Sequence, residues 1–191
     1  MATPVRKPAT FEDLLAQEAR DRLEIIAGEL VEKASPSPSH ARAERKLAAA
    51  IDPFDRLPGP KGPGGWWLFT EIHTAYPSGE LYCHDAAGWR RDRVAQQPTE
   101  WPVRIRPDWV CEIMSVKHEK QDVIDKPRVL HTAEVPHYWL LDPEARLLLV
   151  HRWSGAGYIV VQRAAAGETL RAEPFDAIEI RIGSLFGDDD E

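Results

Sequence analysis

Six residues, Trp109-Val110-Cys111-Glu112-Ile113-Met114, constrain this chain more than any other stretch of it. Five of the six are apolar, and such a nearly continuous apolar run is typical of a strand that is covered on both faces of its sheet. The exception, Glu112, would lose most of its hydration there, which costs several kcal/mol unless a cation or hydrogen-bond donors compensate. The sequence therefore predicts that Glu112 is either paired structurally or part of a functional site.

The nearest acidic residue on the same strand face is Asp108, because side chains alternate along a strand. Four residues at about 3.3 Å each separate the two Cα atoms by about 13 Å. Two ligands of one Mg²⁺ each lie only about 2.1 Å from the ion. Glu112 therefore needs a partner on a neighbouring strand, about 4.8 Å away, and we interpret Asp108 as structural, bonded to a nearby amide or to Arg106.

Length and composition predict one α/β domain over residues 1–191. The chain is 43% apolar and 29% charged, which is typical of a globular protein. Cys83 and Cys111 lie in apolar surroundings, which predicts reduced, buried thiols and a cytoplasmic location. No apolar run approaches 18 residues and Met1–Pro8 has no apolar segment after its charges, so we expect neither a membrane partner nor a secretory signal.

The formal net charge of −7 argues against broad, non-specific binding to nucleic acid, which needs a basic face. Four of the negative charges lie in Asp188–Glu191, and we expect an acidic, disordered tail over residues 187–191. Removing those four charges from −7 leaves −3 on the rest of the chain. The charge balance thus weakens a nucleic-acid function without excluding it.

Local patterns predict a mixed sheet with a few helices on its faces. Thr10 caps a helix to about Arg20, and Ser39 caps a second helix from His40 to about Asp55. Ala27-Gly28 connects the two strands of a hairpin, and a short helix begins near Pro127. Trp109 and Trp139 are predicted to be core anchors. Further strands are predicted over residues 66–72, 81–85, 138–142, 147–153, 158–162 and 178–182.

The seven histidines show no paired spacing of the kind that zinc ligands have, which disfavours a histidine-based metal site. His84, next to Asp85, is nevertheless placed where it could line a site.

Six stretches in a fixed order resemble one known family. They are residues 24–31, 71–73, 85–91, 106–115, 122–126 and 135–143. Together they resemble the Uma-two family of putative restriction endonucleases, a bacterial branch of the PD-(D/E)xK nuclease superfamily, over about residues 10–185. The resemblance implies a restriction-endonuclease-like mixed central sheet flanked by helices, with metal-binding carboxylates on adjacent strands.

The resemblance also implies roles for individual residues. Asp85 matches the Asp of the family's Pro-Asp motif, and Glu112 matches the Glu of its Glu-Ile-Leu-Ser motif. Lys126 matches a lysine that follows an Asp, and Glu71 matches an acidic position of one subgroup. Asp85 and Glu112 would hold Mg²⁺ or Mn²⁺ while Lys126 assists the hydrolysis of phosphodiester bonds in DNA.

Other positions either extend the resemblance or depart from it. Three arginines just beyond Asp85 would contact phosphates at the rim of the site, namely Arg90, Arg91 and Arg93. His84 stands where the family has proline, and Met114 stands where the wider superfamily has its lysine. Leu130 and Glu134 replace an aromatic residue and a glycine.

Each candidate also has a structural interpretation that the sequence leaves open. Asp85 could end a strand and start a turn, Glu112 could pair with an arginine or with Lys126, and Lys126 could be solvated. The three arginines could form a solvated face. For the whole chain, the alternatives are a catalytically inactive nuclease-fold module that binds nucleic acid or a protein partner, and hydrolysis of another phosphate ester. A homodimer would supply two sites for cutting two strands.

Overall fold

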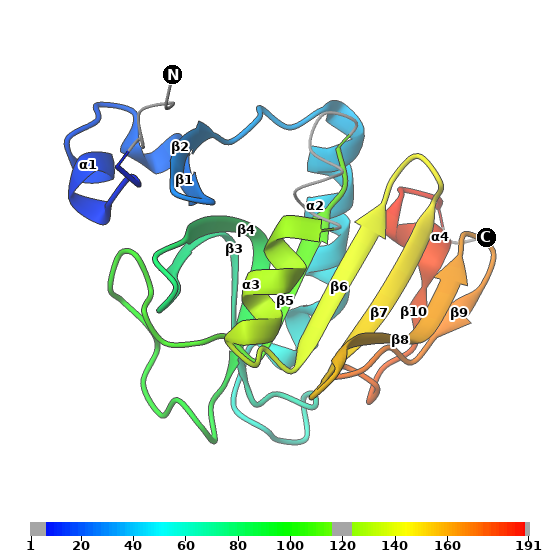
Figure 1. Cartoon of the computed structure of the whole chain (residues 1–191). Helices are drawn as coiled ribbons and strands as arrows, with labels where there is room; N and C mark the ends of the chain where they lie inside the picture. The colour runs from blue at the N-terminus through cyan, green and yellow to red at the C-terminus, as the bar shows by residue number, and fades with distance from the viewer. Residues whose placement is uncertain (1–6, 116–123, 190–191) are drawn as a thin grey trace.

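The computed structural model describes residues 7–115 and 124–189, and its centre is an eight-stranded mixed sheet (Figure 1). The strand order is β2-β1-β4-β5-β6-β7-β8, with β3 paired to β4. A separate two-stranded sheet pairs β9 with β10. The strands are β1 (Leu23–Ile26), β2 (Glu29–Glu32), β3 (Trp66–Ala75), β4 (Leu81–Arg90), β5 (Trp109–Ile113), β6 (His137–Asp142), β7 (Leu147–Ser154), β8 (Gly157–Ala165), β9 (Thr169–Leu170) and β10 (Ile180–Arg181).

The pairing of β4 creates a seam in the sheet. One edge of β4 pairs with β3 along its length, from Leu81 to Arg90. The other edge pairs with β1 only at Leu81 and with β5 only at Ala86–Gly88. Between these contacts, residues 82–85 have no strand partner on that edge within the described part of the chain. Backbone groups near such a gap need side-chain partners, so the seam is a natural place for buried polar side chains.

Helices cover both faces of the sheet. They are α1 (Phe11–Leu15), α2 (Pro38–Ile51), α3 (Lys126–Thr132) and α4 (Ile182–Leu185). Leu47 of α2 and Leu185 of α4 join one apolar cluster, whereas Leu130 of α3 joins the cluster on the opposite face. The predicted mixed sheet flanked by helices is confirmed.

The predicted core anchors are confirmed. Trp109 and Trp139 are fully buried, and their rings meet edge to face with centroids 5.4 Å apart. Cys83 and Cys111 are buried and free, as their surroundings predicted. The central strand therefore has the two-sided cover that its apolar run indicated, and Glu112 within it is 1% exposed.

The predicted hairpin is confirmed, and its turn explains the Ala-Gly pair. Ala27 and Gly28 have φ values of 51° and 76°, as a type I′ turn between β1 and β2 requires. Thr10 caps α1 through a capping box with Asp13. The prediction that this helix reaches Arg20 is wrong, since α1 ends at Leu15. Residues 17–22 carry no large apolar side chain, so packing does not support a longer helix.

The second helix begins earlier and ends earlier than predicted. Ser37, not Ser39, caps α2, because its hydroxyl accepts from the His40 amide at 3.2 Å and Pro38 suits the first helical turn. The α-helix ends at Ile51 and continues as a 3₁₀ turn over Asp52–Phe54. Pro53 lacks the amide donor that a further α-helical turn would use.

The last strand candidate and the chain end also differ from expectation. Within 178–182 only Ile180–Arg181 is a strand, and α4 follows at once. Asp188, in the predicted disordered tail, lies 2.6 Å from Arg146 and donates its amide to the Gly183 carbonyl. Residues 190–191 of that tail lie outside the described residues, as do residues 116–123, which include Asp122 of the family-like segment. Among the described residues, no helix has both the length and the apolar character needed to span a membrane.

Candidate functional site

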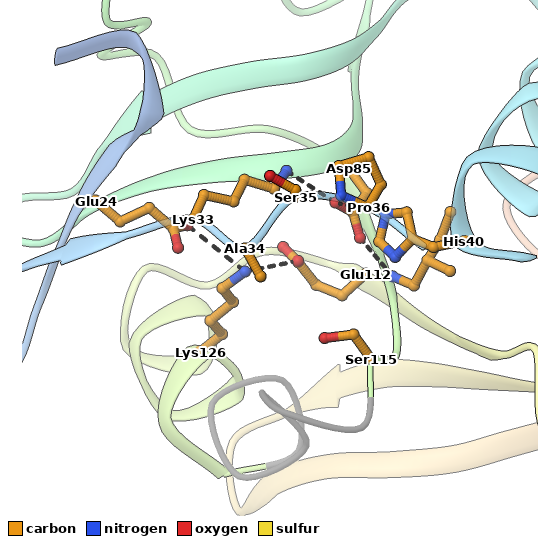
Figure 2. A pocket seen from close by; sticks show the side chains of 11 residues that line it. Glu24, Lys33, Ala34, Ser35, Pro36, His40, Asp85, Glu112, Ser115 and Lys126 are labelled. Carbon is orange, nitrogen blue, oxygen red and sulfur yellow. Dashed lines mark hydrogen bonds and ion pairs between the residues drawn. The ribbon is translucent and has the colours of Figure 1, made fainter. Parts of the chain in front are cut away.

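A small pocket opens at the seam of the sheet (Figure 2). It contains three of the predicted site residues, Asp85, Glu112 and Lys126, while Glu71 lies beside it and contacts Lys33. Its lining residues come from β1, β4, β5, α2, α3 and the segment after β2. They are Glu24, Lys33, Ala34, Ser35, Pro36, His40, Asp85, Glu112, Ile113, Ser115 and Lys126.

Asp85 stands on β4 at the unpaired stretch of its edge. Its Oδ2 atom accepts the Ile113 amide of β5 at 2.7 Å, a side-chain link where the strand ladder is missing. Its Oδ1 atom lies 2.8 Å from Lys33 Nζ and 3.4 Å from His40 Nε2. Neither contact has hydrogen-bond geometry, so this buried oxygen has no aligned donor among the described residues. Asp85 is thus embedded in the sheet and does not start a turn.

Glu71 faces Asp85 from the neighbouring strand. Thr70 pairs with Ala86 and Ile72 with His84, which places Glu71 opposite Asp85 in the register. Glu71 has a φ of 49°, a left-handed backbone conformation that costs a non-glycine residue about 1–2 kcal/mol. Strained residues of this kind cluster at functional sites.

Lys33, which follows β2, joins the two carboxylates. Its ammonium lies 2.8 Å from Asp85 Oδ1 and donates to Glu71 Oε1 at 3.0 Å and to the Cys83 carbonyl at 2.9 Å. Burial by itself would lower the pKa of Lys33, but the carboxylate of Asp85 holds it above its usual value. Lys33 therefore carries a fixed positive charge at the pocket wall.

Glu112 has partners on both of its carboxylate oxygens. His84 Nδ1 lies 2.5 Å from Oε1, and Lys126 Nζ donates to Oε2 at 2.7 Å. Lys126 is 4% exposed and also lies 3.6 Å from Glu24 Oε1. The interpretation of Lys126 as a solvated lysine is therefore wrong, and the pairing of Glu112 with Lys126 is confirmed.

His84 continues this chain of contacts away from the pocket. Burial and the charge of Lys126 lower the pKa of His84 to about 3, so the imidazole is neutral at pH 7. A neutral imidazole has one N–H donor. If Nδ1–H donates to Glu112, Nε2 is free to accept from the Tyr76 hydroxyl at 2.6 Å. His84 thus holds Glu112 from behind and is not among the residues that line the pocket.

The two carboxylates that the family pattern pairs contact opposite layers of the fold. Asp85 meets His40 of α2, whereas Glu112 meets Lys126 of α3. They line one pocket because the seam leaves the edge of β4 open between the layers.

Electrostatics separate the two carboxylates. Burial would raise the pKa of Asp85, but His40 and Lys33 hold it below its usual value. Burial raises the pKa of Glu112 to about 7, with the charge of Asp85 adding to the effect and Lys126 opposing it. Asp85 is therefore ionised at neutral pH, while Glu112 titrates near it. Two carboxyl groups with diverging pKa values are a frequent feature of functional sites.

The three arginines of the predicted rim lie elsewhere. They are at and beyond the far end of β4, where Arg90 pairs with Asp92 at 2.6 Å and Arg91 donates to the Trp66 carbonyl at 2.6 Å. Arg93 donates to Asp108 at 2.7 Å. None of them lines the pocket that contains Asp85 and Glu112.

Asp108 is the structural residue that the strand geometry predicted. Its Oδ2 atom accepts the Arg90 amide at 2.8 Å, and Arg106 lies 3.8 Å away. It occupies the opposite end of β5 from Glu112.

Three residues that line the pocket were not predicted as site residues, namely Glu24, Lys33 and His40. Glu24 had a signal, because Leu23-Glu24-Ile25-Ile26 encloses one carboxylate in apolar residues just as the Glu112 strand does. In the fold, Glu24 accepts the Cys83 amide at 2.9 Å across the seam. Lys33 had none, since a lysine after a charged strand end is typical of a surface.

The donor set suits an oxygen-seeking divalent cation on the Asp85 side of the pocket. Asp85 Oδ1 is buried without an aligned donor, and ligand atoms of His40, Glu71 and Asp85 all lie within 4.8 Å of one another. The carboxylate oxygens of Glu71 and Asp85 suit Mg²⁺ and Mn²⁺, and His40 adds a nitrogen ligand atom.

A family model described as a putative restriction endonuclease, Uma2, matches residues 8–183. The chain belongs to the Uma2 family. No curated protein matches the sequence. The crystal structure of a putative nuclease belonging to DUF820 from Anabaena variabilis superposes with a TM-score of 0.72 at 18% identity, covering 94% of this chain and 98% of that one. At that identity the likeness shows that the two share a fold, and the family match and the fold confirm the resemblance found in the sequence.

Proposed function

We propose that this Uma2-family chain is a metal-dependent endonuclease that hydrolyses phosphodiester bonds in DNA. The observation that carries the proposal is the buried Asp85 Oδ1, which lacks an aligned donor in a pocket shared with Glu112 and Lys126. Its nearest partners are the Lys33 ammonium at 2.8 Å and His40 Nε2 at 3.4 Å, so the surroundings of this oxygen already favour positive charge. A divalent cation would suit the same position.

Each pocket residue has its own role in this proposal. Asp85 and Glu112 would hold Mg²⁺ or Mn²⁺, which when bound polarises a phosphate and lowers the pKa of a water ligand. Lys126, aligned by Glu112 at 2.7 Å, offers positive charge to a phosphate entering the pocket. His84 fixes the Glu112 carboxylate, and Glu71 adds negative charge beside Asp85. Ser115 and the Ile113 carbonyl supply further oxygen atoms at the pocket wall.

Nicking of supercoiled plasmid tests the proposal. The wild-type protein should relax the plasmid in the presence of Mg²⁺ or Mn²⁺, and EDTA should stop the nicking. Asp85→Asn and Lys126→Gln should each lower the nicking rate at least about 100-fold. Asp108→Asn is the matched control, since it alters a buried carboxylate at the other end of the β4–β5 pair. The assays are carried out under conditions in which circular dichroism shows that every variant is folded. Equal nicking by wild type and Asp85→Asn would mean a contaminating nuclease and would end the proposal.

A second function has one specific observation in its favour. Both oxygens of Glu112 already have protein partners, His84 and Lys126, and His84 replaces the family's proline. These contacts suit a catalytically inactive module that keeps the fold to bind nucleic acid or a protein partner. DNA binding by wild type without metal-dependent nicking would favour this module.

A further inference from the structure

The side of the pocket that faces α2 contains a ligand set that the family pattern does not describe. His40 from α2, Glu71 from β3 and Asp85 from β4 bring one ligand atom each within 4.8 Å of the others. Three different elements converge there, and the register places two of the residues opposite each other. Glu71 has a left-handed backbone conformation there, with a φ of 49°.

A positive charge already lies against two residues of this set, Asp85 and Glu71. The ammonium of Lys33 contacts three oxygens, those of Asp85, Glu71 and the Cys83 carbonyl, at 2.8 to 3.0 Å. Two carboxylate oxygens and one backbone carbonyl oxygen therefore surround the Lys33 ammonium. Even so, Asp85 Oδ1 has no aligned hydrogen bond, although the Asp85 side chain is only 3% exposed.

Glu112 is less suited than these residues to complete a cation site with Asp85. Its two oxygens are held by His84 and Lys126 at 2.5 and 2.7 Å, toward the layer of α3. Each carboxylate oxygen keeps a second lone pair, but these two contacts fix the orientation of the Glu112 carboxylate. His40 and Glu71 already flank Asp85, and a cation that binds among them has to displace only the Lys33 ammonium.

We propose that His40, Glu71 and Asp85 form the divalent-cation site, with the Lys33 ammonium holding the metal's place in the metal-free chain. This inference rests on the proposed function, because it takes Asp85 as a metal ligand. It replaces Glu112 by His40 and Glu71 as the other ligands. An imidazole ligand favours Mn²⁺ and other transition metals over Mg²⁺. Because ligand oxygens lie only about 2.1 to 2.2 Å from such an ion, Lys33 must leave Asp85 and Glu71 when metal binds.

Mn²⁺ binding to the full chain without DNA tests the ligand set directly. Titration followed by electron paramagnetic resonance gives the affinity, and electron spin echo modulation detects a nitrogen ligand on the bound ion. We expect ¹⁴N modulation in wild type that changes to the ¹⁵N pattern when histidine is ¹⁵N-labelled, and Mn²⁺ binding at least about 10-fold tighter than Mg²⁺ binding. This measurement on wild type needs no variant to fold.

Variants then assign the nitrogen and the competing charge. His40→Gln should abolish the modulation and weaken Mn²⁺ binding about 10-fold, whereas Lys33→Met should tighten binding about 10-fold because a competing cation is removed. His151→Gln is the control, since His151 contacts the Tyr138 carbonyl on other strands. Modulation that persists in folded His40→Gln overturns the inference.

The outcomes separate this inference from the proposed function. Mn²⁺ bound without nitrogen modulation, or lost in Glu112→Gln but not in His40→Gln, overturns the histidine set while leaving an Asp85–Glu112 nuclease standing. Nitrogen modulation from His40 without nicking supports the site and overturns the nuclease. No Mn²⁺ binding by folded wild type overturns the site.

Discussion

The two ends of the β4–β5 pair both bury a carboxylate against cations, and they satisfy it differently. At the arginine end, Asp108 accepts aligned hydrogen bonds on both oxygens, from Arg93 and from the Arg90 amide. At the pocket end, Asp85 Oδ1 lies near Lys33 and His40 with neither aligned. Charge pairs that serve only the fold are expected to be fully hydrogen-bonded. The Asp85 end departs from that rule where the seam opens.

The pocket end also uses a different cation and deeper burial. Arg93 is one-third exposed, so water screens its pair with Asp108, whereas the Lys126 side chain is 5% exposed beside a Glu112 that is 1% exposed. Removing a charged group at the pocket end should therefore destabilise the fold more than removing one at the arginine end.

The largest expected effect on stability is that of Lys126→Met. Removing one partner of a buried ion pair costs about 3–5 kcal/mol, because the other charge stays buried without compensation. Urea unfolding at pH 8 should show this loss for Lys126→Met and a clearly smaller one, about 1 kcal/mol, for Arg93→Met. Equal losses of unfolding free energy in Lys126→Met and Arg93→Met would contradict the difference between the two ends.

The next effect is a pH dependence that belongs to the pocket end. Burial raises the folded pKa of Glu112 to about 7 from an ordinary value of 4.5. A raised carboxyl pKa stabilises the fold fully below the unfolded pKa, and that stability is lost as pH rises through the folded pKa. The free energy of unfolding should therefore fall by about 3 kcal/mol between pH 4.5 and pH 7.5.

Glu112→Gln removes the ionisable group, so the difference between its unfolding profile and that of wild type isolates this contribution. Asp108→Asn, the control at the arginine end, should keep the wild-type slope in the same window. A Glu112→Gln profile parallel to wild type would mean that Glu112 does not titrate there.

The smallest effect concerns the backbone of Glu71. Its φ of 49° is accessible to glycine without the steric cost that an L side chain carries. Both Glu71→Gly and Glu71→Ala remove the contact with Lys33, so their difference reports the relief of backbone strain less the entropy that glycine gains in the unfolded chain. We expect Glu71→Gly to be about 1 kcal/mol more stable than Glu71→Ala by urea unfolding. If Glu71→Ala were the more stable variant, the backbone at Glu71 would not be strained.

The central strand could be predicted from the sequence, because Glu112 is an isolated charge in an apolar run. A buried carboxylate needs a partner to compensate for its lost hydration, so a partner for Glu112 could be predicted too. The same argument applies to Glu24, which the fold uses to hold the seam. Lys33 and His40 could not be placed from the sequence, because their roles arise when the hairpin arm and α2 converge on Asp85. The arginines next to Asp85 in sequence were misleading, since a strand extends five residues over about 16 Å.

The most direct test of the account is a metal titration of thermal unfolding for wild type and Asp85→Asn, with Asp108→Asn as control. At a hundredfold excess of Mn²⁺ over Kd, wild type and Asp108→Asn should gain about 2.7 kcal/mol of stability. Asp85→Asn should gain none. An equal gain in Asp85→Asn, or no gain in folded wild type at millimolar Mn²⁺, would contradict the claim that Asp85 is a ligand of a divalent cation.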